Sequence, residues 1–173
     1  MKIFNTLSGK KENFVPIEEN KIKMYVCGMT VYDHTHIGHA RTFLSFDLIV
    51  RYLRSINYEV NYIRNVTDVD DKIISRAEEL GITPKELTEK YIDSMNDDFL
   101  SLGMIKPDSE PRATDNIDSI ISLIEILIQK GHAYEGDSDV YFSAESFNSY
   151  GKLSRRKKEV LSIIIIIFIQ CNK

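Results

Sequence analysis

Cysteine is scarce in this sequence, and its scarcity excludes several kinds of site. The two cysteines, Cys27 and Cys171, lie far apart, so they form neither a disulfide framework nor a Cys-x-x-Cys metal-binding motif. The first residues, from Met1 to Leu7, also lack the apolar segment of a secretory signal. We therefore expect a protein of the reducing cytoplasm.

Long apolar runs and a surplus of positive charge are missing as well. The longest apolar run, Ile163–Ile169, is far shorter than the roughly 20 helical residues needed to cross a bilayer, so we expect no membrane-bound form. The net charge of −4 excludes a basic nucleic-acid coat, and RNA binding would require a local basic surface or a further domain. With 173 residues and 43% apolar content, the chain can bury one core or slightly more.

Histidine, by contrast, is concentrated in one stretch, Lys23–Arg41, which holds three of the four histidines and Cys27. Apolar residues alternate from Ile22 to Val26, the pattern breaks at Gly28, and a helical pattern begins after a polar loop. A strand, a glycine-containing loop and a helix with histidines at its start are typical of a nucleotide-binding βαβ unit.

The surrounding pattern predicts an α/β fold. We expect a strand at 22–27, a helix at 38–56 and a second strand at 58–65, and a crossover of this length implies a parallel pair. The predicted buried stripe of the helix consists of Phe43, Leu44, Leu48, Tyr52 and Leu53, widened by Ile49 and Ile56. In the second strand, Val60 and Tyr62 are expected on the face opposite to Asn61 and Arg64.

Further elements follow from caps and turns. Helices are predicted from Asp71 to Leu80 and from the capping box that begins at Thr83. Between them and the next helix, which Thr114 is expected to cap, residues 103–112 form a proline-containing loop. The remaining predictions are a short N-terminal arm or hairpin, a hairpin formed by 132–134 and 140–142, and no regular element in the isoleucine run at 163–169.

The tetrapeptide His36-Ile37-Gly38-His39 is the strongest candidate for binding phosphate. Histidines three residues apart at a helix start share one face, and Gly38 allows a ligand to approach the backbone closely. Free helix amides together with two imidazole donors suit a triphosphate, above all the charge that develops during transfer. The alternative is that one histidine merely caps the helix, but the preceding strand and glycine loop favour the phosphate interpretation.

Cys27 has two interpretations, a small buried hydrophobe or a thiolate ligand of a metal. Zinc needs three or four protein ligands, and of the nearby His34, His36 and His39 at least two are committed to the phosphate site. The residues therefore assemble no complete zinc site.

Asp68, Asp70 and Asp71 follow the second predicted strand, at the edge where ligands of parallel sheets bind. These acids suit a substrate amine, a metal or a ribose. Helix capping with solvated charge explains them equally well, so both interpretations stay open.

Taken together, these motifs resemble the class I aminoacyl-tRNA synthetases, specifically the cysteinyl-tRNA synthetase family. The resemblance covers roughly residues 1–155 and rests on several separate motifs in order. They are Met24–Asp33 running into His36–Thr42, Arg64–Ile73, Lys106-Pro107 with Glu110–Thr114, and Gly131–Tyr134.

The resemblance implies the N-terminal half of a class I synthetase Rossmann-like parallel sheet, with the start of an inserted connective domain. Residues 1–115 would form the first half of the catalytic domain, 116–155 the start of the insertion, and 156–173 an aberrant or disordered tail. The implied activity is ATP-dependent activation of L-cysteine to cysteinyl-adenylate and transfer to tRNA(Cys), by a cytoplasmic monomer.

The resemblance also implies roles for individual residues. His36 and His39 would be catalytic and would bind ATP together with Gly28 and Gly38. For the amino acid, Thr30 and Asp68 would bind the substrate, and Cys27 would ligate a zinc ion that binds the substrate thiolate. A thiophilic metal would discriminate cysteine from serine better than an ordinary pocket, which separates such near-isosteres by roughly 1–3 kcal/mol.

Two alternatives remain. After Ser154 the sequence matches neither the family's KMSKS loop nor its other zinc ligands, so we expect the chain to fold poorly and not to aminoacylate. It would then be an inactive truncated or frame-shifted remnant. The other alternative is a cysteine-activating ligase with an amino-sugar acceptor, although Val31 and the Ala40-Arg41-Thr42 segment favour the synthetase.

Overall fold

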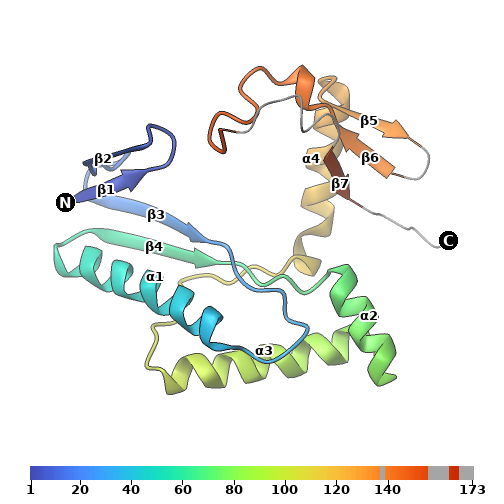
Figure 1. Ribbon diagram of the computed structural model, residues 1–173, viewed down its shortest axis with the longest axis horizontal. Helices are drawn as coiled ribbons and strands as arrows, with labels where there is room; N and C mark the ends of the chain where they lie inside the picture. The colour runs from blue at the N-terminus through green and yellow to red at the C-terminus, as the bar shows by residue number, and fades with distance from the viewer. Residues whose placement is uncertain (137–138, 156–163, 168–173) are drawn as a thin grey trace. The chain divides into compact units, whose positions relative to one another are not determined.

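The computed structural model describes residues 1–136, 139–155 and 164–167 (Figure 1). The chain divides into two compact units. One comprises Pro16–Ile117, and the other combines Met1–Val15 with the described residues from Asp118 onward. The domain boundaries expected from the resemblance, at 115 and 155, stay predictions.

The centre of the first unit is a strand–helix–strand motif, as the sequence predicts. β3 (Lys21–Val26) pairs in parallel with β4 (Glu59–Arg64), and α1 (Ile37–Ser55) connects them. The register runs from Lys21 opposite Glu59 to Val26 opposite Arg64. The α/β prediction with its parallel pair is therefore confirmed.

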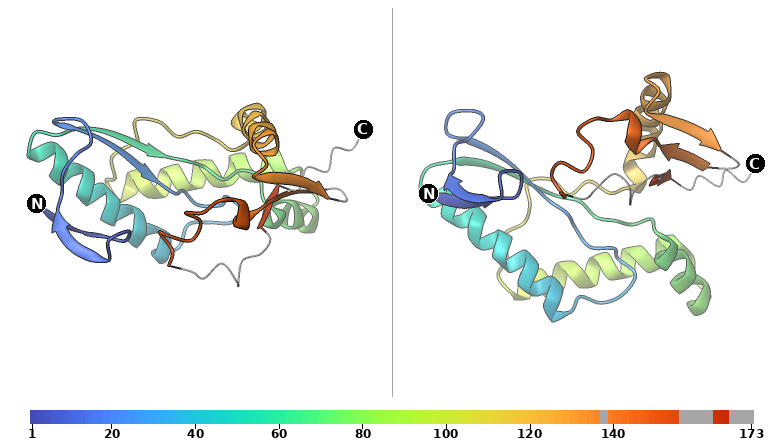
Figure 2. Two further views of the ribbon diagram at one scale, coloured as in Figure 1. Left: turned by 90° about the horizontal axis from the view of Figure 1, so that it is seen from above. Right: turned by 45° about the horizontal axis from the view of Figure 1, so that its top comes forward.

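Two more helices follow β4, as the turn residues predict. α2 (Asp71–Leu80) ends at Gly81, whose φ of 67° is the left-handed conformation that glycine adopts readily. α3 (Pro84–Ser101) begins with the predicted capping box, in which the Glu86 N–H donates to Thr83 Oγ1 (3.2 Å) and the Thr83 N–H donates to the Glu86 carboxylate (2.8 Å). In Figure 1 and in the right view of Figure 2, α1 and α3 lie on the same side of the β3–β4 pair.

The predicted loop after α3 contains an extended segment that the sequence pattern did not indicate. The N–H groups of Arg64 and Val66 donate to the carbonyl oxygens of Ser109 (3.1 Å) and Pro111 (2.9 Å), and the Ala113 N–H donates to the Val66 carbonyl (3.2 Å). These contacts form short parallel bridges beside β4 and its exit. Prolines hid this segment because they cannot donate to a strand ladder, although Pro111 still accepts through its carbonyl.

The predicted buried stripe of α1 is wrong for most of its members. Phe43 and Leu53 are buried, but Leu44, Leu48, Ile49, Tyr52 and Ile56 are exposed. The buried face instead continues through Val50 and the carboxylate of Asp47. Asp47 can be buried because it accepts hydrogen bonds from the Ile105 N–H and from Arg51 Nε, both at 2.7 Å.

Arg64 also lies on the opposite face from the predicted one. It shares the buried face of β4 with Val60 and is only 4% exposed. Its guanidinium carbon lies 5.1 Å from the ring centroid of Phe43 and 4.7 Å from that of Phe99, and its Nε donates to Glu110 (3.1 Å). Two aromatic faces and a carboxylate thus replace the water that a charged group would lose on burial.

In its described residues, the second unit contains small antiparallel sheets, one α-helix and a short 3-10 helix (Ala144–Ser146). The predicted N-terminal hairpin is formed by β1 (Lys2–Asn5) and β2 (Lys10–Asn13). The predicted later hairpin is formed by β5 (Ala133–Gly136) and β6 (Asp139–Phe142), after α4 (Ile117–Gln129). No helix in the described ranges is long and apolar enough to cross a membrane.

Two expectations for this later part of the chain are corrected. β7 (Ile164–Ile167) pairs antiparallel with β6, so the isoleucine run does contain a regular element. β-branched residues favour extended backbone, which explains the strand. The rest of the run, at 163 and 168–169, lies outside the described residues. Thr114 begins a 3-10 turn (Thr114–Asn116) without capping it through its side chain, which binds Asp68 instead.

Because Arg64 is buried, we expect removal of the Glu110 carboxylate to lower the free energy of unfolding more than removal of the Glu79 carboxylate. Glu110→Ala would leave a buried guanidinium without its partner, so we expect the free energy of unfolding in urea to fall by about 3 kcal/mol. Glu79→Ala is the matched control because its partner Arg76 has a side chain that is 38% exposed, against 5% for Arg64, so its loss should cost much less. Equal losses for the two variants would contradict a supporting role for the buried pair.

Candidate functional site

The start of α1 is built by the two histidines of the tetrapeptide. His36 is the N-cap residue, and its Nδ1 accepts hydrogen bonds from the N–H groups of Gly38 (3.1 Å) and His39 (3.4 Å). In return, the His36 N–H donates to His39 Nδ1 (3.4 Å). The expectation that the helix amides are free is therefore wrong for Gly38 and His39, because the imidazole of His36 accepts hydrogen bonds from both N–H groups. The capping interpretation is therefore confirmed for His36, and a ligand role for the same side chain stays a prediction.

This capping geometry determines which ring nitrogens can donate. An Nδ1 atom that accepts a backbone N–H carries no proton itself, so in each neutral imidazole the proton is on Nε2. The rings of His36 and His39 are stacked, with centroids 3.8 Å apart and planes inclined by 17°. The start of α1 thus presents two adjacent Nε2–H donors, on one exposed and one half-buried side chain.

The local environment also controls the charge of His39. Partial burial, and secondarily the neighbouring His36, lower the pKa of His39 below its ordinary value of 6.5. His39 is therefore neutral at neutral pH and serves as a hydrogen-bond donor and not as a fixed cation. This state matches its role as acceptor for the His36 N–H.

The loop before the tetrapeptide is tied to the exit of β4. The Val31 N–H donates to the Thr67 carbonyl (3.1 Å), and the Thr67 N–H donates to the Met29 carbonyl (3.2 Å). Thr30 forms the isolated parallel bridge with Thr67 at this point and is half-buried. The predicted substrate residue Thr30 therefore lies beside the exit of the second strand.

Gly28 is required by backbone packing. Its N–H donates to Asn65 Oδ1 (2.7 Å), and a Cβ atom at Gly28 would lie 1.7 Å from the Asn65 carbonyl oxygen. No larger residue fits without moving the strand exits. The need for glycine at position 28 is thus explained by backbone packing, without any contact to phosphate.

Cys27 is exposed, so the interpretation of this residue as a buried hydrophobe is wrong. It lies directly after β3, at the expected edge of the sheet. In the part of the chain that the structure describes, no group of three or more His, Cys, Asp or Glu side chains could hold a metal ion. These residues therefore do not fit a zinc ion, because Cys27 offers one ligand of the three or four required.

The acidic residues after β4 divide between two roles. Asp70 caps α2 by accepting the Lys72 N–H (2.9 Å), which confirms the capping interpretation for this residue. Asp68 is 7% exposed and accepts the Thr114 N–H (3.0 Å) and the Thr114 hydroxyl. Asp68 is thus engaged in joining the exit of β4 to the segment before α4.

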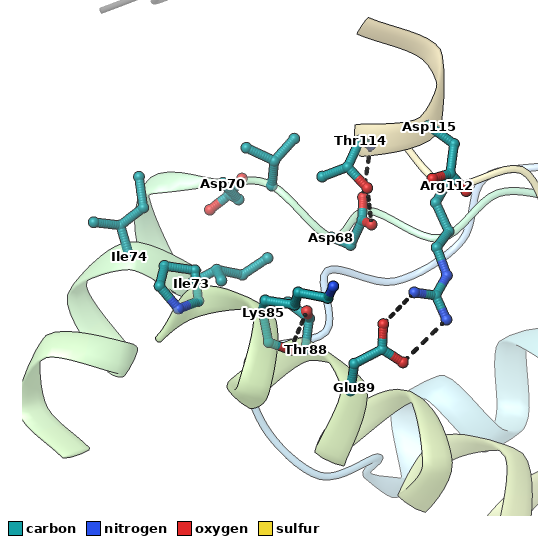
Figure 3. A pocket seen from close by; sticks show the side chains of 12 residues that line it. Asp68, Asp70, Ile73, Ile74, Lys85, Thr88, Glu89, Arg112, Thr114 and Asp115 are labelled. Carbon is teal, nitrogen blue, oxygen red and sulfur yellow. Dashed lines mark hydrogen bonds and ion pairs between the residues drawn. The ribbon is translucent and has the colours of Figure 1, made fainter. Parts of the chain in front are cut away.

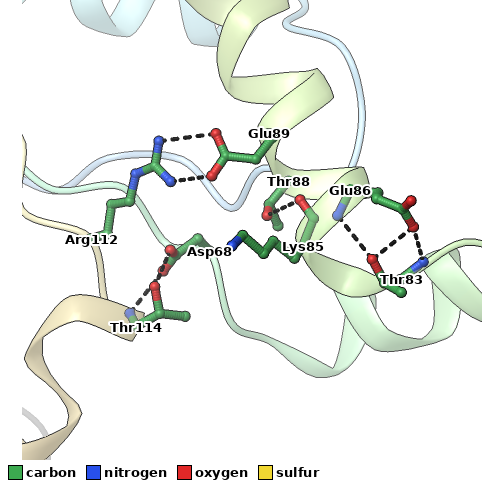
Figure 4. Close-up of polar contacts among 8 residues, drawn as sticks. All are labelled: Asp68, Thr83, Lys85, Glu86, Thr88, Glu89, Arg112 and Thr114. Atoms are coloured by element: carbon green, nitrogen blue, oxygen red, sulfur yellow. Dashed lines mark hydrogen bonds and ion pairs between the residues drawn. The ribbon is translucent and has the colours of Figure 1, made fainter.

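A cavity of about 520 Å³ lies beside Asp68 (Figure 3). Its walls come from residues 68–74, from the first turns of α3 and from residues 112–115. The side chain of Lys85 is directed toward Asp68, and Arg112 is held by both oxygens of Glu89 (Figure 4). The hydrogen bond from Arg112 lowers the pKa of Glu89, so the pair is charged at neutral pH.

The predicted site residues therefore lie in more than one place. His36, Gly38 and His39 form one cluster at the start of α1, whereas Asp68 lines the cavity, whose walls include neither that cluster nor Cys27. The sequence pattern did not single out the cavity residues Lys85 and Glu89 or the contact between Arg112 and Glu89. The only signal was the Glu110–Thr114 motif, which marks Arg112 without showing what it contacts.

Comparisons with known proteins bear on the identity of this arrangement. The family described as "tRNA synthetases class I (C) catalytic domain" matches residues 13–172, so the similarity extends past residue 155, where the sequence analysis ended it. The Cysteine--tRNA ligase of Marinomonas sp. (strain MWYL1) is 57% identical over 160 residues, which are 92% of this chain and 35% of that protein. The Cysteine--tRNA ligase of Haemophilus influenzae (strain PittGG) is 56% identical over 162 residues, or 93% and 35% of the two chains.

A similar solved structure supports the fold. The crystal structure of the Agrobacterium radiobacter K84 agnB2 LeuRS–tRNA–LeuAMS ternary complex matches with a TM-score of 0.60 and 25% identity, over 78% of this chain and 18% of that one. This chain spans about a third of the length of the curated relatives that it matches. Because the family match covers nearly all of its residues, the chain belongs to the class I tRNA synthetases, in the family of the cysteine-type catalytic domain.

Proposed function

We propose that this chain supplies the ATP-binding histidines of an enzyme that activates L-cysteine to cysteinyl-adenylate and transfers it to tRNA(Cys). The observation that carries the proposal is the stacked pair of His36 and His39 at the start of α1. The names of the relatives support cysteine as the amino acid and tRNA as the acceptor, and favour tRNA over an amino-sugar.

The proposed chemistry is electrostatic. Activation joins the cysteine carboxylate to the α-phosphate of ATP and releases pyrophosphate, so negative charge grows on the β- and γ-phosphates. Two Nε2–H donors at a helix N-terminus stabilise that charge, and they do so most strongly as it develops. The neutral state of His39 suits this role because its donor geometry is held by a backbone hydrogen bond.

The capping hydrogen bonds refine which groups bind phosphate. The amides of Gly38 and His39 already donate to His36 Nδ1, so the imidazoles are the donors that phosphate meets first. Gly38 keeps the His36 ring close, because a Cβ atom there would lie 2.8 Å from His36 Cε1. Gly28 contributes indirectly, by holding the loop against the exit of β4.

The amino-acid side of the proposal involves Thr30 and Asp68 as substrate-binding residues. Asp68 would act from the wall of the cavity, with its carboxylate already held by Thr114. The resemblance assigns Cys27 to zinc, but the described residues add too few ligands to it, so no step is derived through a metal. A cytoplasmic location and a monomeric state belong to the same proposal.

ATP binding by this chain tests the central step. We expect His36→Ala and His39→Ala each to weaken ATP binding about tenfold, because each removes one hydrogen bond to a charged oxygen. Isothermal titration calorimetry measures the affinity, and His132→Ala is the matched control because His132 contacts Ser146 in the other unit. Unchanged affinity in both tetrapeptide variants would contradict the proposal.

Substrate dependence tests the assignment of cysteine and tRNA. For the enzyme to which this chain contributes its histidines, the proposal expects exchange of pyrophosphate into ATP to require cysteine, and charging to occur on tRNA(Cys) and not on an amino-sugar. Serine is the comparison substrate because it differs from cysteine in a single atom. Equal exchange with serine would contradict cysteine as the substrate.

The lowered pKa of His39 predicts a pH dependence of stability. Since the folded pKa lies below the unfolded value of 6.5, the unfolded chain binds more protons in that window and stability rises with pH. Stability is therefore lost as the pH falls through 6.5 toward the lower pKa of the folded state, and the thermal midpoint should drop. His39→Gln should reduce this dependence, whereas the control His132→Gln should retain it. Identical slopes for these two variants would rule out His39 as the source.

A further inference from the structure

The residues immediately before the tetrapeptide are fastened to α3 by side chains. His34 Nδ1 lies 2.8 Å from the hydroxyl of Ser94, and its ring meets the edge of Tyr91 with centroids 5.0 Å apart. The hydroxyl of Thr35 donates to the carboxylate of Asp98. Two consecutive loop residues are thus held by one helix, at the position where the chain turns into His36.

The contacting residues on α3 form a single stripe. Tyr91, Ser94 and Asp98 are spaced by three and four residues, so they share one face of the helix. Tyr91 is buried, whereas Ser94 and Asp98 are only half-buried and add little apolar surface to the core. Their contribution is therefore directional hydrogen bonding and not packing.

The position of α3 itself is fixed independently of the loop. Phe99 of α3 contacts Phe43 of α1, with ring centroids 5.2 Å apart, and both rings flank the guanidinium of Arg64. A rigid α3 thus offers the loop two anchor points that do not depend on the loop's own conformation. At its other end, the loop is held by the backbone hydrogen bonds between Val31 and Thr67.

We propose that Ser94 and Asp98 are positioning residues for the histidine pair. By holding His34 and Thr35, they direct the backbone into the extended N-cap conformation of His36 (φ −124°, ψ 171°). That conformation brings His36 Nδ1 onto the Gly38 and His39 amides and turns both Nε2–H groups into donors for phosphate. This inference rests on the proposed function for its effect on ATP, but its structural part can be tested without ATP.

The test compares four variants of the full chain. Asp98→Ala and Thr35→Val remove the two halves of one hydrogen bond, and Thr35→Ser restores the hydroxyl. Asp97→Ala is the matched control, because Asp97 is an exposed acid on the same helix next to Asp98. The readouts are hydrogen exchange at the Gly38 and His39 amides, imidazole nitrogen spectra that report the protonated ring nitrogen, and ATP affinity by calorimetry.

We expect Asp98→Ala and Thr35→Val each to accelerate exchange at both amides about tenfold, since a lost anchoring hydrogen bond lets the cap open more often. The same variants should lower the share of Nε2-protonated imidazole and weaken ATP binding, while Thr35→Ser restores all three properties. Asp97→Ala should behave like the unmodified chain. If Asp98→Ala fails to fold, Thr35→Val still tests the same hydrogen bond, because it leaves α3 unchanged.

The outcomes separate this inference from the proposed function. If the unmodified chain binds no ATP, the proposed function fails, while amide exchange and nitrogen spectra still decide the positioning role. If exchange and spectra in Asp98→Ala and Thr35→Val match those of Asp97→Ala, the positioning role is overturned even when ATP binds. A loss that Thr35→Ser fails to reverse also overturns it, because a hydroxyl at position 35 would then not be the required group.

Discussion

The guanidinium of Arg64 is buried between two phenylalanine rings and a glutamate, and four segments of the chain meet around it. Arg64 ends β4, Phe43 belongs to α1, Phe99 to α3, and Glu110 to the extended segment beside β4. A cation can remain in such a place only while every partner stays in position, because uncompensated burial of charge is costly. Arg64 therefore helps to fix the geometry of α1 relative to α3, on which we propose that the histidine pair depends.

Regular elements with strong local signals could be predicted from the sequence. The parallel β3–β4 pair, α1, α2 and α3 all have periodic patterns or caps, and the capping box at Thr83 appears in full. The faces were harder to predict, because hydrophobic counting assumes that charges point outward. Asp47 and Arg64 point inward, each with hydrogen-bonding partners that are distant in sequence. Such partners leave no mark within a helix or strand window.

The candidate site shows the same division between local and distant information. His36 and His39 could be located because the tetrapeptide follows a strand and a glycine loop. Whether the amides of α1 would be free could not be predicted, because this depends on the backbone conformation of one residue. The engagement of Asp68 by Thr114 was equally hidden, since the two residues are 46 positions apart. At the start of α1, the position of the histidine motif could therefore be predicted from the sequence, but its hydrogen bonds could not.

Gly28 in the loop and Gly38 in the first turn of α1 would respond differently to substitution. At Gly28, any side chain would meet the backbone of Asn65, which belongs to a second strand exit and cannot rotate away. At Gly38, an added methyl group would meet only the imidazole of His36, which can swing aside. In a survey of natural or engineered variants, both positions would be intolerant, but for unlike causes. Changes at Gly28 would lower the amount of folded protein, and changes at Gly38 would displace the His36 ring in protein that still folds.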